Sequence, residues 1–171
     1  GYIVDAMADA LSGHGATRFL INAGGDIRAA GDRGDKLPWT IAVRDPEDKV
    51  PSWDNESWQR SIVPDLIQIT DGGVATSGSY EVYFDRDRLA HHIVKGQTGR
   101  SPTHAMSVTV AAATTMEADA LATAVFVLGP NEGKRLIDEL DGCECLIIDR
   151  QGKQARSSGW GEIATSGSKP E

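Results

Sequence analysis

Two polar residues, Asp119 and Thr123, interrupt an apolar stretch that runs from Ala118 to Leu128. They are four positions apart, so in a helix their side chains lie one above the other on a single face. Ala122 would narrow this face and let a ligand approach. A carboxylate beside a hydroxyl suits a hard cation such as Mg²⁺ or Ca²⁺. The alternative, that Asp119 caps a loop backbone or pairs with an arginine, is the one that spacing alone favours.

Two further segments combine glycine with polar side chains. Gly24 and Gly25 precede Asp26, and a double glycine allows positive φ or the close approach of a ligand; a plain hairpin turn is the favoured interpretation. Thr76-Ser77-Gly78 gathers hydroxyls around a glycine, as anion-binding backbone often does, although such clusters more often form ordinary loops.

Two adjacent histidines, His91 and His92, stand at the end of a predicted strand. Side chains of neighbouring strand residues point to opposite faces, so one histidine can be buried while the other is solvated. The two cysteines, Cys143 and Cys145, are too few for a disulfide scaffold, and we interpret them as small hydrophobic residues.

The composition is that of a soluble globular domain. The chain has 171 residues, 40% hydrophobic and 25% charged, with a formal net charge of −8. The negative charge argues against a broad nucleic-acid-binding surface, and no apolar run reaches the roughly 18 residues of a transmembrane helix. The first residues, Gly1-Tyr2-Ile3, read as the inside of a helix, so we expect that further sequence precedes them.

Hydrophobic periodicity predicts the elements that must position these residues. Helices are expected over 2–12, from Thr114 or Thr115 to Leu128, and over 131–140. Strands are expected over 19–21, 27–30, 39–43, 62–69, 82–84, 89–94, 107–112 and 145–148. Turns are expected over 71–73, 85–88, 96–100 and 149–152, and a surface loop over 44–58. Pro64 implies an edge or a bulge, and the tail from Ser157 to Glu171 is expected to be loose.

Strand hairpins mixed with two or three helices predict an α+β domain on a mixed or largely antiparallel sheet. We expect residues 1–156 to form part of one domain and 157–171 to form the loose tail.

The order of several short motifs is more specific than any one of them. Gly1-Tyr2 is followed by Asn22-Ala23-Gly24-Gly25-Asp26-Ile27, Ala75-Thr76-Ser77-Gly78-Ser79-Tyr80-Glu81, His91-His92-Ile93, Thr98-Gly99-Arg100, Glu117-Ala118-Asp119-Ala120, Ala122-Thr123 and Val127-Leu128-Gly129. In this order and spacing the chain resembles the C-terminal half of the ApbE family, the FAD:protein FMN transferases, over roughly residues 1–140. The resemblance implies an ApbE-like, T-fold-like architecture.

The resemblance also implies an activity. Members of the family take FAD as substrate and use Mg²⁺, transfer the FMN moiety to a Thr or Ser hydroxyl of a target protein, and release AMP. By the same resemblance Asp119, Ala122 and Thr123 match metal-binding positions, Ala122 through its backbone carbonyl, and His92 matches the candidate general base. The matched flavin-binding positions are Asn22, Gly24, Gly25, Asp26, Thr76, Ser77, Gly78, Ile93, Thr98 and Gly99. Phosphoryl transfer is mainly positioning and charge stabilisation, which suits these residue types.

Two positions depart from the family pattern. Lys95 stands where the family usually has Asp, and Gly96 where it has Pro, which puts a cation beside the proposed base. Two alternatives therefore stay open: hydrolysis of FAD to FMN and AMP, and a flavin-binding module without turnover. The resemblance points to the bacterial cell envelope, with a cytoplasmic location also open, and the sequence assigns neither an acceptor protein nor an oligomeric state.

Overall fold

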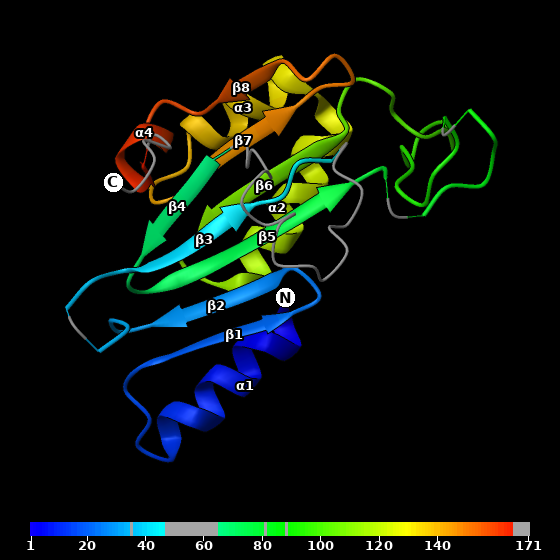
Figure 1. Cartoon of the computed structure of the whole chain (residues 1–171). Coiled ribbons are helices and arrows are strands. Elements are labelled where there is room, and N and C mark those ends of the chain that lie inside the picture. The colour runs from blue at the N-terminus through cyan, green and yellow to red at the C-terminus, as the bar shows by residue number, and fades with distance from the viewer. Residues whose placement is uncertain (35, 47–64, 81, 88, 166–171) are drawn as a thin grey trace, which may run out of the picture.

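The structure of the chain, a computed structural model, describes residues 1–34, 36–46, 65–80, 82–87 and 89–165 (Figure 1). The helices are α1 (Tyr2–Gly13), α2 (Thr115–Leu128), α3 (Pro130–Asp138) and α4 (Trp160–Ile163). The strands are β1 (Phe19–Ala23), β2 (Asp26–Ala30), β3 (Trp39–Val43), β4 (Asp65–Ile69), β5 (Gly72–Gly78), β6 (Ser107–Ala112), β7 (Glu144–Ile148), β8 (Gln154–Arg156) and β9 (Ala164–Thr165).

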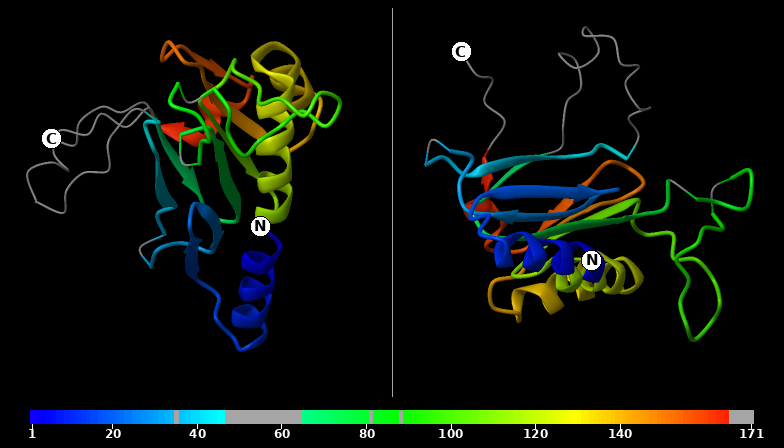
Figure 2. Two further views of the ribbon diagram at one scale, coloured as in Figure 1. Left: turned by 90° about the vertical axis from the view of Figure 1, so that its right-hand side faces the viewer. Right: turned by 90° about the horizontal axis from the view of Figure 1, so that it is seen from below.

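These elements form three layers (Figure 2). The central layer is a six-stranded sheet in the order β1-β2-β5-β6-β7-β8, and a second sheet has the order β3-β4-β9. Every pair of neighbouring strands in both sheets is antiparallel. Helices α1, α2 and α3 cover one face of the large sheet, and the small sheet covers the other (Figure 2). The predicted α+β class with an antiparallel sheet is confirmed.

The central position of β6 explains its sequence. All six of its residues are buried, which fits a strand that is covered on both faces. Val108 and Val110 belong to the core beneath α2, whereas Ala111 belongs to the core beneath the small sheet. Successive side chains of a strand point to opposite faces, so one short apolar run contributes to both cores.

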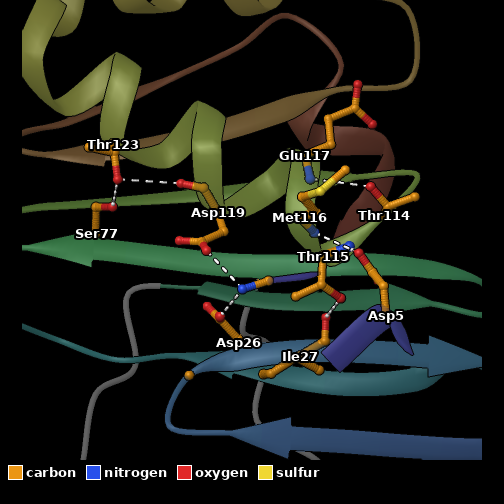
Figure 3. A network of polar contacts seen from close by, with 12 residues as sticks. Asp5, Asp26, Ile27, Ser77, Thr114, Thr115, Met116, Glu117, Asp119 and Thr123 are labelled. Atoms are coloured by element: carbon orange, nitrogen blue, oxygen red, sulfur yellow. Dashed lines mark hydrogen bonds and ion pairs between the residues drawn. The ribbon is translucent and has the colours of Figure 1, made fainter. Parts of the chain in front are cut away.

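The N-terminus of α2 is fixed by three separate groups. Thr114 is the N-cap residue, and its hydroxyl accepts a hydrogen bond from the backbone N–H of Glu117 at 3.2 Å. Asp5 of α1 accepts from the backbone N–H groups of Thr115 and Met116 at 2.9 and 2.8 Å (Figure 3). A Cβ at Gly73 would lie 2.3 Å from the Thr115 nitrogen, so glycine is needed where β5 meets the helix. These contacts hold Asp119, one turn further on, in a defined place.

The segment after β8 differs from the expected loose tail as far as the structure describes it. Trp160 of α4 is fully buried in the core between the two sheets. Its indole Nε1 donates to Asp65 at 2.9 Å, and Arg156 lies 3.2 Å from the same carboxylate. β9 then pairs with β4. A single large aromatic residue therefore anchors a stretch whose Gly and Ser content suggested disorder.

Three further expectations differ from the structure. Gly72 and Gly73 begin β5 rather than complete a turn, and Thr76-Ser77-Gly78 ends this strand instead of forming a loop. The stretches 82–84 and 89–94 form no regular strands within the described residues, because their pairing is limited to an isolated bridge between Tyr83 and His91. The part of the expected 62–69 strand that contains Pro64, and most of the expected 44–58 loop, lie outside the described residues.

No helix in the described part of the chain is long and apolar enough to cross a membrane.

Candidate functional site

Asp119 lies where the first turns of α2 approach the hairpin between β1 and β2 (Figure 3). Its carboxylate lies 2.8 Å from the backbone nitrogen of Gly1, and the Asp26 carboxylate lies 2.5 Å from the same nitrogen. The side chain of Asp119 is 49% exposed and that of Asp26 is 28% exposed. Two carboxylates distant in sequence therefore converge on the backbone nitrogen of Gly1, and Asp119 is an open group rather than a buried one.

Thr123 connects this helix face to the sheet. Its hydroxyl lies 2.9 Å from the Ser77 hydroxyl at the end of β5 (Figure 3). It also lies 3.4 Å from the Asp119 backbone carbonyl, to which it can donate. On the neighbouring residue of β5, the Thr76 hydroxyl lies 2.9 Å from that of Thr109. The predicted alignment of Asp119 with Thr123 is present with the Ser77 hydroxyl beside it, whereas the Thr76–Thr109 pair lies on the other face of the sheet.

A pocket of about 470 Å³ opens beside these hydroxyls. It gathers residues from β5, from α2 and from the segment that follows β5. The lining residues are Thr76, Ser77, Gly78, Tyr80, His92, Ile93, Val94, Asp119 and Thr123. Seven of the residues that the sequence indicated, three from β5, two from α2 and His92 with Ile93, therefore share one pocket.

A second pocket, of about 650 Å³, adjoins the first, since Asp119 and Thr123 line both. Asp26 and Ala23 line it from the hairpin, and Gly1 lines it from the N-terminal side of α1. The Asp119 carboxylate thus stands at the boundary between two open spaces.

The two adjacent histidines have opposite environments. His91 is 1% exposed, whereas His92 is exposed at the pocket. The Nδ1 atom of His92 lies 3.3 Å from the Val82 carbonyl, and because a carbonyl only accepts, the two form a hydrogen bond only when Nδ1 carries the proton. This contact leaves the Nε2 lone pair of His92 available as a proton acceptor. The expected division into one buried and one solvated histidine is present, although neither residue belongs to a regular strand.

Several of the indicated residues are not brought to this pocket. Asn22, Gly24 and Gly25 form the turn of the β1–β2 hairpin, where the Asn22 side chain accepts from the Gly25 N–H at 3.1 Å. Both glycines have positive φ, 69° and 107°. Thr98 and Gly99 form a turn closed by hydrogen bonds from their N–H groups to the Lys95 carbonyl. Local turn geometry accounts for the residue types in both segments.

Ala122 also lies away from the pocket. Its side chain is fully buried in the core between α2 and the sheet. This differs from the expectation that Ala122 narrows the polar face of the helix. As an interior residue of α2, its carbonyl is in position to accept the usual i+4 helical hydrogen bond, so nothing in this arrangement supports Ala122 as a metal ligand.

Three residues of the site were not singled out from the sequence. Tyr80 and Val94 line the pocket, and Asp5 fixes the N-terminus of α2. Tyr80 packs so closely on Gly78 that a Cβ there would lie 2.3 Å from its ring. The run of small residues from Thr76 to Ser79, directly before Tyr80, was the feature of the sequence that could have indicated this contact. Asp5, 110 positions from its partner Thr115, left no local signal.

Both cysteines lie in the core beneath α2. Burial raises the pKa of the Cys143 thiol and that of the Cys145 thiol to about 11. The thiols are therefore protonated at neutral pH, which agrees with a packing role.

Comparisons with known proteins place the chain in a family. The model of the ApbE family matches residues 1–147. A Vibrio cholerae protein named FAD:protein FMN transferase is 35% identical over 172 residues, which cover 99% of this chain and 47% of that protein. The Escherichia coli K12 protein of the same name is 34% identical over 154 residues, which cover 89% of this chain and 41% of that protein.

Solved structures show the same fold. The crystal structure of the ApbE protein from Thermotoga maritima matches with a TM-score of 0.82 and 31% identity, and the match covers 97% of this chain and 51% of that one. The flavin transferase ApbE from Vibrio cholerae matches with a TM-score of 0.73 and 31% identity, over 94% of this chain and 48% of that one. This chain spans about half the length of the relatives that it matches.

Proposed function

This chain belongs to the ApbE family, and we propose that it supplies one part of the active site of an FAD:protein FMN transferase. The proposed reaction joins the FMN phosphate of FAD to a Thr or Ser hydroxyl of an acceptor protein and releases AMP. The observation that carries the proposal is the shared pocket, in which a histidine with a free ring nitrogen and an open carboxylate face the same space. The names of the relatives supply the substrate, FAD, and the existence of a protein acceptor.

His92 is the proposed general base. Its Nε2 accepts the proton of the acceptor hydroxyl as the hydroxyl oxygen forms a bond to the FMN phosphorus. The bond from this phosphorus to the bridging oxygen breaks, and AMP leaves with that oxygen. General base catalysis of this kind contributes about 10²–10⁴-fold to a rate. Lys95, in the place of the family's usual Asp, is not among the residues that line the pocket, so the substitution leaves the space around His92 open.

The donor set near Asp119 fits Mg²⁺. The Asp119 carboxylate lies near the Thr123 and Ser77 hydroxyls, and carboxylate, hydroxyl and water oxygens are the ligands that Mg²⁺ prefers. Asp119 and Thr123 would hold the ion, with Asp26 nearby, across the Gly1 nitrogen. Bound Mg²⁺ would neutralise charge that develops on the diphosphate.

Flavin contacts are proposed from the same pocket. Thr76, Ser77 and Gly78 would line the diphosphate and flavin side of the site, and the Ile93 backbone would contact FAD. The turn residues Asn22, Gly24, Gly25, Thr98 and Gly99 stay in the proposal only as outer neighbours of the site, because local hydrogen bonds account for their positions.

The test is incubation of the purified full-length protein with FAD, Mg²⁺ and an acceptor peptide that contains Ser or Thr. We expect flavin fluorescence that stays with the peptide through denaturing electrophoresis, together with released AMP. Free FMN and AMP without labelled peptide would indicate hydrolysis instead, and unchanged FAD would indicate a binding module. Either result would refute the transferase proposal.

Asp119→Asn tests the metal part of the proposal. Removing one ligand charge should weaken the dependence on Mg²⁺, so that more Mg²⁺ is needed for half-maximal rate, and should lower turnover by at least about tenfold. Asp9→Asn, on the exposed side of α1, is the control and should behave as wild type. Normal turnover and normal Mg²⁺ dependence in Asp119→Asn would show that this carboxylate is only a structural partner of Gly1.

A further inference from the structure

The buried histidine next to the proposed base, His91, is held by contacts of its own. The Nε2 atom of His91 lies 2.9 Å from the Pro102 carbonyl, and because a carbonyl only accepts, Nε2 carries the proton. Nδ1 is buried and finds no hydrogen-bond partner among the residues that the structure describes. A proton on Nδ1 would be a buried donor without an acceptor, so the contacts select the neutral ring with its proton on Nε2.

The backbone of His91 is held as firmly as its ring. The Ser101 hydroxyl accepts from the His91 N–H at 2.9 Å and donates to the His91 carbonyl at 2.7 Å. The His91 ring meets the ring of Phe126 edge to face, at 5.5 Å between centroids and 87° between planes. Phe126 belongs to α2, the helix that carries Asp119. His91 therefore ties the segment after β5 both to the 101–102 stretch and to the helix of the candidate metal site.

His92, by contrast, has few contacts of its own. It is exposed, and its Nδ1 and its backbone N–H both approach the Val82 carbonyl, at 3.3 and 3.4 Å. Both distances are at the long end of the range for a hydrogen bond. The pairing of the two backbone stretches around His91 brings Val82 into reach, through the Tyr83–His91 bridge and the bond from the Phe84 N–H to the Ala90 carbonyl at 2.7 Å.

From these contacts we propose that His91 is a positioning residue for His92. The buried ring fixes the backbone at residue 91, this keeps Val82 beside the next residue, and the Val82 carbonyl holds the proton of His92 on Nδ1. The Nε2 atom that faces the pocket then keeps its lone pair. If the proton moved to Nε2, that atom would no longer accept a proton from the acceptor hydroxyl. The catalytic part of this inference rests on the proposed transferase function, whereas the tautomer part does not.

Two substitutions distinguish the role of the aromatic ring of His91 from the role of its N–H donor. His91→Phe keeps an aromatic ring against Phe126 but loses the bond to the Pro102 carbonyl. His91→Gln loses the ring but keeps an N–H donor at about the same reach from the backbone. His104→Leu is the matched control, because His104 gives an equivalent ring bond to the Phe126 carbonyl at 2.9 Å and does not line the pocket. Thermal unfolding establishes that each variant is folded.

The first measurement is the tautomer of His92 in protein labelled with ¹⁵N-histidine, from long-range ¹H–¹⁵N correlation spectra at pH about 8, where an ordinary imidazole is neutral. The signals of His91, His92 and His104 are assigned by their loss in the variants that replace each residue. In wild type we expect His91 to carry its proton on Nε2 and His92 on Nδ1. In His91→Phe the His92 proton should move largely to Nε2, whereas His91→Gln and His104→Leu should keep the wild-type spectrum at His92.

The second measurement separates kcat from KM in FMN transfer. His91→Phe should lower kcat by about tenfold, which corresponds to about 1.4 kcal/mol of barrier, with the KM for FAD within about threefold of wild type. His91→Gln should restore most of the rate. If the wild type transfers no FMN while His91→Phe still shows the change of tautomer at His92, the proposed function is refuted and the positioning role stands.

Three results would overturn the positioning role. They are a His92 in wild type without its proton on Nδ1, a folded His91→Phe whose His92 keeps the wild-type tautomer, and a change in His104→Leu as large as that in His91→Phe. If His91→Phe does not fold, a shifted His92 tautomer in His91→Gln would count equally against the role assigned to the donor.

Discussion

Asp5→Asn tests how α2, the helix that carries Asp119 and Thr123, is held in place. The Asp5 carboxylate accepts from the N–H groups of Thr115 and Met116, which are otherwise open donors at the start of α2, and lies 3.8 Å from Arg28. Burial would raise the pKa of this carboxyl, but the N–H groups of Met116 and Thr115 and the charge of Arg28 outweigh burial and lower the pKa. The charged form of Asp5 is therefore the one that the fold stabilises.

The expected loss of stability follows from the contacts that asparagine can keep at position 5. Its single carbonyl oxygen can keep one of the two N–H bonds, whereas the second bond, the charge and the attraction to the helix N-terminus are lost. A hydrogen bond to a charged group contributes about 1.5–3 kcal/mol, and the side chain is only 19% exposed. We expect Asp5→Asn to lower the free energy of unfolding by about 1–3 kcal/mol at pH 7, or about 2–4 °C in Tm for each kcal/mol.

The pH dependence has a definite sign. Because the pKa of Asp5 is lower in the folded than in the unfolded protein, its contribution is complete above the unfolded value of about 3.9. The contribution is lost as the pH falls from there through the folded pKa. The difference in unfolding free energy between wild type and Asp5→Asn should therefore be constant from pH 7 to about pH 5 and shrink toward pH 3.

Urea unfolding followed by circular dichroism at several pH values measures this difference. Asp9→Asn, a carboxylate on the exposed side of the same helix, should change stability by less than about 0.5 kcal/mol at every pH. A stability difference for Asp5→Asn that is equal at pH 7 and pH 3, or no larger than that of Asp9→Asn, would refute the account of how α2 is anchored.

Two other predictions concern the packing around the site. Gly73→Ala places a Cβ 2.3 Å from the Thr115 nitrogen, so β5 and α2 must separate, and we expect the free energy of unfolding to fall by about 2 kcal/mol or more. Gly13→Ala, with open space at its Cβ, is the control in the same urea unfolding experiment. Equal stability of the two variants would contradict the close packing. Trp160→Ala should cost about 3–5 kcal/mol as a fully buried residue, whereas a loose C-terminal segment would show almost no change in urea unfolding.

The sequence predicted the elements whose signals are local. The apolar runs over 107–112 and from Ala118 to Leu128 are patterns of neighbouring residues, and β6 and α2 form where these patterns predict them. The alignment of Asp119 with Thr123 is local in the same sense, whereas the pocket that they share with Thr76–Gly78 and His92 was implied only by the family resemblance.

The structure differs from these predictions where contacts between residues distant in sequence determine the local structure. Trp160 turns a Gly/Ser-rich stretch into an ordered one because a large aromatic side chain gains more by burial between two sheets than the local composition opposes. The apolar residues of 82–84 and 89–94 resemble strands, yet these stretches lie beyond the sheet, and Ser101 holds His91 there (Figure 1). The capping of α2 by Asp5 joins residues 110 positions apart, and no local pattern indicates such a pair.

The central claim is that His92 is the base in FMN transfer, and a single-turnover comparison of wild type with His92→Ala tests it most directly. FAD affinity is measured by calorimetry and transfer to the acceptor peptide by the covalent flavin formed in one turnover. We predict that His92→Ala binds FAD within about threefold of wild type and transfers FMN at least about 10²-fold more slowly. Transfer by His92→Ala at the wild-type rate would contradict the claim.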